Sequence, residues 1–171
     1  MEEYWDLYDS ERRPLGSTVL RGQLVSMSGK YHVVVMIMTM NSRGQLLCTL
    51  RSPEKSNYPN LWEFTAGSAL AGEDSLTAAK RELFEETGIL AGDGELKFIR
   101  TVKENSAFID CYFIRRDIDI SDIVLQEGET VKAKWVGKAE FENMMAQKKV
   151  AFPVSRRYGQ LYDCLMQEGF I

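Results

Sequence analysis

Three glutamates, Glu82, Glu85 and Glu86, have the spacing that first suggests chemistry in this chain. On a helix, where successive residues are about 100° apart, they fall within an arc of about 100°. Like charges at such spacings repel one another, and Arg81 should point to another side of the helix. An oxygen-rich cluster suits a hard divalent cation such as Mg²⁺, with Mn²⁺ as a substitute. A solvated acidic surface is the competing interpretation.

The element that must position these carboxylates is a helix predicted over residues 75–87. Asp74 or Ser75 is a suitable N-cap, and Gly88 stands where a C-cap belongs. Neither Pro nor Gly interrupts the segment, so it can remain helical throughout. The apolar stripe that should face the core consists of Leu76, Ala79 and Leu83.

The helix belongs to a longer pattern of fixed spacing. Gly67 is followed by five residues, Glu73, seven residues and then the run Arg81-Glu82-Leu83-x-Glu85-Glu86-x-Gly88-Ile89. This pattern resembles the Nudix box, a loop-helix-loop that holds divalent metal against a diphosphate. The resemblance implies that Glu82, Glu85 and Glu86 are metal ligands and that Gly67 lends its backbone carbonyl. It assigns structural roles to Glu73, Arg81 and Gly88, while Ser68 replaces the second glycine of the commonest form.

The same resemblance implies an enzyme that hydrolyses a nucleoside diphosphate linked to another moiety. Bound Mg²⁺ would neutralise the diphosphate and lower the pKa of a water molecule. A carboxylate would then accept the proton of that water. The base remains open among Glu82, Glu127 and Glu129. With Glu85, these are the expected catalytic carboxylates.

A closer resemblance, to the isopentenyl diphosphate isomerase-like branch of the Nudix superfamily, extends beyond the box. It rests on residues 6–16, 31–56 and 60–67. In the isomerases, an arginine and a lysine at the spacing of Arg51 and Lys55 hold the substrate diphosphate. Because a phosphate bound to such side chains makes charge-assisted hydrogen bonds, we expect both residues to bind substrate.

The isomerase reaction itself is disfavoured. The isomerases place a catalytic cysteine immediately before the box glycine and a metal-binding histidine after it, where this chain has Ala66 and Ser68. Cys48 lies 18 residues before Ala66, within a predicted strand. A hydrolase with isomerase-like architecture is therefore preferred. A nucleotide-binding module without activity is the other alternative, although such modules usually lack box carboxylates that are present here.

The composition limits the remaining classes of protein. With 171 residues, 44% of them hydrophobic, the chain fits one domain, and its net charge of −4 provides no basic field for nucleic acid or membrane. The three cysteines are far apart and should be reduced thiols. The N-terminal residues lack the features of a signal peptide, so we expect a cytoplasmic protein. The expected partner is a small-molecule diphosphate, and a homodimer is left open.

The fold class expected is α/β (α+β), a mixed and mostly antiparallel sheet between helices in an α/β/α arrangement. Residues 4–21 should form a hairpin, and the apolar run 32–40 a strand covered on both faces. Further strands are predicted near residues 45–50, 95–104 and 107–116, and residues 125–136 should be a loop that enters another strand. Helical spacing marks residues 138–147 and 155–168. His32, the single histidine, is interpreted as structural.

Overall fold

The computed structural model describes residues 2–23 and 29–171. Its centre is a mixed sheet with the strand order β5-β4-β3-β8-β7, in which β6 also pairs with β3 and β9 with β4. Only the β3–β8 pairing is parallel among these described strands. The strands are β3 (His32–Met40), β4 (Leu46–Arg51), β5 (Trp62–Glu63), β6 (Thr65–Ser68), β7 (Lys97–Glu104), β8 (Ala107–Arg115) and β9 (Thr130–Val136).

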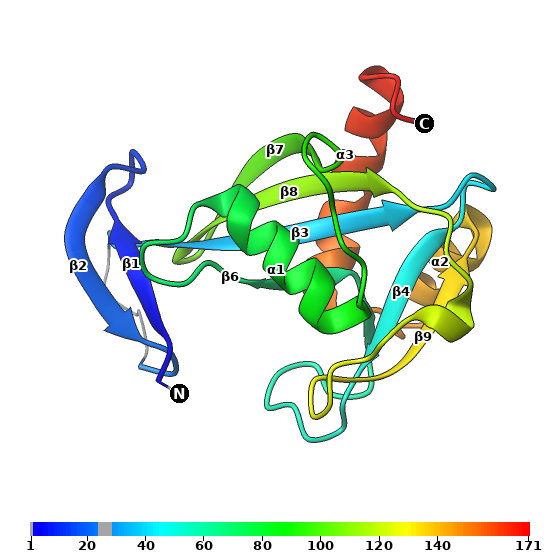
Figure 1. Cartoon of the computed structure of the whole chain (residues 1–171), viewed down its shortest axis with the longest axis horizontal. Helices are drawn as coiled ribbons and strands as arrows, with labels where there is room; N and C mark the ends of the chain where they lie inside the picture. Colours follow the sequence, from blue (N-terminus) through cyan, green and yellow to red (C-terminus); the bar gives the residue numbers. More distant parts are fainter. Residues whose placement is uncertain (1, 24–28) are drawn as a thin grey trace.

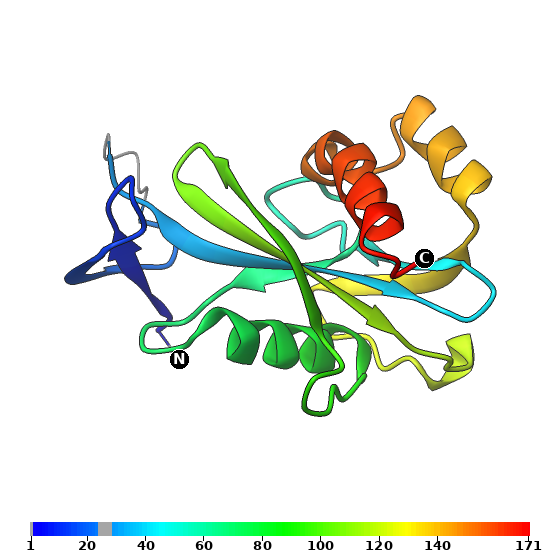
Figure 2. The same ribbon diagram turned by 90° about the horizontal axis from the view of Figure 1, so that it is seen from above.

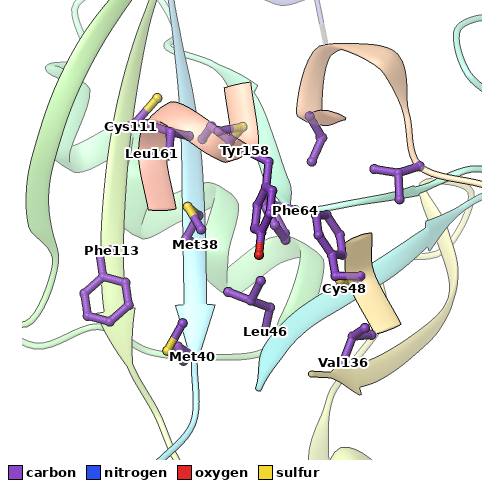
Figure 3. Close-up of a cluster of buried hydrophobic side chains, with 14 of the residues drawn as sticks. Met38, Met40, Leu46, Cys48, Phe64, Cys111, Phe113, Val136, Tyr158 and Leu161 are labelled. Atoms are coloured by element: carbon purple, nitrogen blue, oxygen red, sulfur yellow. The ribbon is translucent and has the colours of Figure 1, made fainter. Parts of the chain in front are cut away.

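Helices cover both faces of this sheet, as Figure 2 shows. One face carries α1 (Ser75–Thr87), and the other carries α2 (Lys138–Ala146) and α3 (Phe152–Gln167). The nine residues of β3 supply both cores, because alternate side chains of a strand point to opposite faces. Val35 and Ile37 pack with α1, whereas Met36 and Met38 pack with α2 and α3 (Figure 3). The predicted fold class is confirmed.

The helix α1 begins and ends where its capping residues predict. The Asp74 side chain accepts a hydrogen bond from the Thr77 N–H, and Gly88 closes the helix at φ 74°. Of the predicted apolar stripe, Ala79 and Leu83 are fully buried, but Leu76 is 41% exposed. The prediction for Leu76 is wrong because this residue lies in the first turn, at the edge of the buried arc.

The N-terminal segment forms a separate two-stranded antiparallel hairpin of β1 (Tyr4–Tyr8) and β2 (Pro14–Leu20). It lies at one end of the molecule (Figure 1). The Trp5 ring stacks on His32 with ring centroids 4.4 Å apart, and backbone hydrogen bonds of 2.8 and 2.9 Å join Tyr8 to Tyr31. Burial lowers the pKa of His32. The histidine therefore has the structural role expected of it.

Two further details concern the C-terminal half and the thiols. The helix α3 begins at Phe152 rather than at residue 155, with a proline in its first turn, where a missing N–H costs nothing. All three cysteines are free thiols, and Cys48 and Cys111 are buried. No helix within the described ranges is long and apolar enough to cross a membrane.

Candidate active site

A polar hollow of about 70 Å³ lies between the end of β6 and the side of α1. Gly67 and Ser68 form one wall of it, and the three glutamates of α1 form another. It adjoins a larger hollow of about 360 Å³, which shares Glu86 and Glu129 and extends to Arg51 and Lys55. The three helix glutamates and the predicted phosphate-binding cations therefore line two connected parts of one site.

Glu86 is the most buried of the three helix glutamates. It is only 5% exposed, and its Oε2 atom has no hydrogen-bond partner within the described part of the chain. Burial raises the pKa of Glu86 well above its usual range, and the nearby carboxylates of Glu63, Glu82 and Glu129 raise it further. An unpaired buried carboxylate is costly, so this oxygen needs a proton or a cation.

Arg81 was predicted to point to another side of the helix from the three glutamates, and this prediction is wrong. Its guanidinium donates hydrogen bonds to Glu82 at 2.8 Å and to Glu85 at 3.0 Å, so it does offset two of the three carboxylates. It also makes two bonds of 2.9 Å to Glu73 and one of 3.0 Å to the Ser68 carbonyl. The position of a residue around a helix fixes only the direction of its Cβ atom, whereas the long side chain of arginine, with five donors, reaches several partners.

Gly67 allows Glu82 to approach the backbone. A Cβ atom on Gly67 would lie 2.0 Å from the carboxyl carbon of Glu82, so no larger residue fits without moving that side chain. Burial raises the pKa of Glu82, and Arg81 opposes this rise. The glycine of the box thus holds space for a carboxylate beside the β6 backbone.

Arg51 and Lys55, predicted to hold phosphate, are each paired with a carboxylate. Arg51 donates to Glu63 at 2.6 Å and to the Asn57 carbonyl at 3.0 Å. Lys55 forms an ion pair with Glu129. Glu63 was not predicted as a site residue, although the alternation of Trp62 and Phe64 places it on the opposite face of the strand. Burial raises the pKa of Glu63 to about 7, against the effect of Arg51.

The structure separates the two acidic residues of the loop before β9. Glu129 lines both hollows. Glu127 is exposed and lines neither of them. Gln126, which was not predicted, lines the smaller hollow.

The N-terminal hairpin also contributes to the site, which the sequence did not predict. Glu3 and Arg21 line the smaller hollow, and Trp5, Arg21 and Gly22 line the larger one. These residues are more than 40 positions from the box, and no local pattern distinguishes them. The closer family resemblance covered residues 6–16, which include none of these four, so it gave no signal for them either.

The residues present fit a hard divalent cation. No three acidic, histidine or cysteine side chains among the described residues converge as a ready-made metal cage. The reason lies in the ion pairs, because Arg81 holds Glu82 and Glu85 while Lys55 holds Glu129. The donors are carboxylate and carbonyl oxygens, which Mg²⁺ prefers. The unpartnered Glu86 oxygen is the atom for which such an ion would provide the missing partner.

The sequence of this chain is similar to those of known proteins of one family. The profile of the NUDIX domain family matches residues 30–158. An uncharacterized Nudix hydrolase of Listeria monocytogenes is 38% identical over 143 residues, which is 83% of each chain. An isopentenyl-diphosphate Delta-isomerase of Pectobacterium atrosepticum is 38% identical over 84 residues, or 48% of this chain and 46% of that protein.

Solved structures show the same fold. The crystal structure of DR0079 from Deinococcus radiodurans superposes with a TM-score of 0.75 at 22% identity, covering 91% of this chain and 98% of that one. The NUDIX domain of Shewanella oneidensis NrtR, solved in complex with ADP ribose, gives a TM-score of 0.62 at 18% identity. It covers 80% of this chain and 86% of that one.

Proposed function

This chain belongs to the Nudix family of pyrophosphohydrolases, and from that premise we propose which bond it cleaves and with which ion. The proposed reaction is hydrolysis of the diphosphate linkage in a nucleoside diphosphate joined to another moiety, with Mg²⁺ as the cofactor. The observation that carries the proposal is the buried, unpartnered Oε2 atom of Glu86, in a hollow lined by further carboxylates. A cation beside the diphosphate would satisfy this oxygen.

In this proposal Glu82, Glu85 and Glu86 hold the metal, together with the backbone carbonyl of Gly67. Mn²⁺, which accepts the same oxygen ligands, is the expected substitute. When bound, the ion supplies charge neutralisation for the diphosphate and a more acidic water molecule. Arg81 releases part of its contact with Glu82 and Glu85 and keeps its two bonds to Glu73, which orient the helix.

The larger hollow provides the cations for the substrate. Arg51 uses its Nη1 and Nε atoms for Glu63 and Asn57, which leaves Nη2 for a phosphate oxygen. Lys55 is paired with Glu129 and would exchange this partner for phosphate. That exchange frees Glu129 to accept the proton of the attacking water. We therefore favour Glu129 as the base over Glu127, which is exposed, and Glu82, which Arg81 holds.

Two alternatives have less support. An isomerase needs an acid beside the box glycine, and Ala66 and Ser68 flank Gly67 instead. Burial raises the pKa of the Cys48 thiol far above its usual range, so this cysteine is an inert core residue. A binding module without activity would not need three glutamates and a fourth carboxylate around one hollow.

The experiment is a panel of nucleotide sugars, ADP-ribose, dinucleotides, nucleoside diphosphates and isopentenyl diphosphate, assayed for product release with Mg²⁺, with Mn²⁺ and with a chelator. The variant Glu86→Gln tests the site, and Glu142→Gln, an exposed glutamate of α2, is the matched control. We expect metal-dependent hydrolysis that Glu86→Gln abolishes and Glu142→Gln preserves. Release of no product from any compound would contradict the proposed reaction.

A cytoplasmic location also belongs to this proposal. All three cysteines are free thiols, and free thiols are typical of reducing compartments. The proposed partner is the small-molecule diphosphate, and with a net charge of −4 the chain is not expected to bind nucleic acid.

A further inference from the structure

The N-terminal hairpin lies outside the residues that the family profile matches, which begin at residue 30. It nevertheless supplies walls of the active site through Trp5, Arg21 and the neighbouring Glu3. Arg21 is the hairpin cation that lines both hollows. An element outside the matched family region therefore borders both hollows of the proposed active site.

The hairpin also contacts the loop of the box directly. The Tyr4 carbonyl accepts a hydrogen bond of 2.7 Å from the Ala71 N–H, and the Asp6 carboxylate accepts one of 2.7 Å from the Gly72 N–H. Figures 1 and 2 show this loop reaching β1. The loop connects Gly67 with Glu73, the partner of Arg81. The position of the hairpin is thus transmitted to the segment that leads into the box helix.

A partly buried ion pair between Arg12 and Asp110 helps to fix the far end of the hairpin. Asp110, in the central strand β8, is 2% exposed, and its Oδ1 atom accepts hydrogen bonds from Arg12 Nη1 at 2.7 Å and Thr101 Oγ1 at 2.6 Å. The second Arg12 nitrogen bonds the other oxygen at 2.5 Å. Arg12 has φ 63°, a left-handed conformation that costs free energy for a residue with a side chain. The two-pronged contact with a buried carboxylate offsets that cost.

We propose that the hairpin determines the substrate specificity of this site. In this proposal Arg21 recognises the moiety beyond the diphosphate, and the ion pair Arg12–Asp110 holds the hairpin in position. This inference rests on the proposed function. Arg21 is paired with Glu3, but both side chains are about half exposed, so this pair is weak and readily exchanged. The group recognised is therefore an anionic or hydrogen-bond-accepting substituent, such as a carboxylate, on the moiety attached to the nucleoside diphosphate.

The recognition role is tested with two nucleotides that differ in one carboxylate, UDP-glucose and UDP-glucuronate. We expect the wild type to favour the uronate in kcat/KM, and Arg21→Gln to reduce this preference about tenfold or more, the size of one charge-assisted contact. The change should appear in KM rather than in kcat. A preference that Arg21→Gln leaves unaltered overturns the recognition role. If neither nucleotide is hydrolysed, the proposed function fails for nucleotide sugars. Calorimetry then compares the binding of UDP-glucose and UDP-glucuronate to the wild type and to Arg21→Gln, and a preference for the uronate that Arg21→Gln leaves unaltered again overturns the recognition role.

The positioning role is tested with Arg12→Met, and Arg13→Met is the matched control because Arg13 is adjacent and 75% exposed in its side chain. Hydrogen exchange of the Ala71 and Gly72 amides reports the contact of the hairpin with the box loop, independently of activity. We expect faster exchange and a weaker uronate preference in Arg12→Met, partial recovery in Arg12→Lys, and wild-type behaviour in Arg13→Met.

Should Arg12→Met unfold, Asp6→Ala provides the second test, because it removes only the exposed contact with Gly72. Faster exchange at Ala71 in Asp6→Ala, with the melting temperature retained, supports the positioning role, because the Tyr4 carbonyl that accepts from Ala71 is still present in this variant. Unchanged exchange at Ala71 in folded Arg12→Met or Asp6→Ala overturns it.

Discussion

Arg51 has two roles in this site, and replacing it by alanine should separate their effects on kinetics and on stability. It is the proposed holder of a substrate phosphate, and it is also the counter-charge of Glu63, which is nearly buried. The first role predicts a change in kinetics, and the second a change in stability. The two changes should respond differently to pH and to a second substitution at Glu63.

The stability effect follows from the pKa of Glu63, which burial raises from 4.5 to about 7. A carboxyl whose pKa is raised on folding stabilises the folded state below its unfolded pKa, and this contribution is lost as the pH rises through the folded pKa. In the wild type this loss of stability with rising pH ends near pH 7. In Arg51→Ala the pKa of Glu63 rises further, so the free energy of unfolding continues to fall above pH 7. Removal of this counter-charge should therefore cost under about 1 kcal/mol at pH 7, and up to about 1.4 kcal/mol more for each pH unit above it.

The assay combines urea unfolding at pH 7 and pH 9 with steady-state kinetics on the best substrate of the panel. Arg51→Ala should raise KM about ten- to a hundredfold, as expected for loss of a charge-assisted contact. Added Glu63→Gln should abolish the pH dependence of the stability loss and leave the KM defect. Arg43→Ala, an exposed arginine in the turn after β3, is the control. A stability loss equal at both pH values would refute the role of Glu63, and an unchanged KM would refute phosphate binding by Arg51.

Three further substitutions test the rest of the site. Glu86→Gln should lower Mg²⁺-dependent turnover by about a hundredfold or more. Without metal, thermal unfolding should show an unchanged or slightly higher melting temperature, because glutamine replaces a carboxyl whose charged form burial disfavours; a large fall in melting temperature would contradict this. Gly67→Ala places a Cβ atom 2.0 Å from the Glu82 carboxyl carbon, so kcat should fall at least about tenfold as this proposed metal ligand moves. A wild-type kcat would argue against the assignment of Glu82. Leu83→Ala, at a fully buried position, should lower the free energy of unfolding measured with urea by about 2–5 kcal/mol. A decrease below about 1 kcal/mol would mean that this side chain does not hold α1 against the sheet.

The elements that the sequence predicted well are those set by local patterns. The apolar run of β3 requires cover on both faces, and the caps of α1 fix its two ends. The spacing of the box brought Gly67 and the glutamates of α1 to one hollow. These are consequences of periodicity over neighbouring residues, which a single sequence contains.

The features that the sequence did not predict depend on long side chains or on distant segments. Arg81 reaches Glu82 and Glu85 because its guanidinium lies several bonds from its Cα atom. Glu63 appeared as an ordinary strand residue until Arg51 was placed beside it. Arg21 enters the site only through the docking of the hairpin, a tertiary contact with no local signal.

The two cores of the protein differ in their content of sulfur. The core beneath α2 and α3 contains Met36, Met38, Met40, Met144, Cys48 and Cys111. Among the residues that the structure describes, the buried side chains of the core beneath α1 include neither methionine nor cysteine. Isotope-labelled methyl groups of these buried methionines would therefore act as NMR reporters of the core that lies across the sheet from α1. A nucleotide that shifted these resonances would reveal a structural response transmitted through β3. Of the two cores, this is the one that oxidants able to convert thioethers to sulfoxides would damage whenever the chain opens.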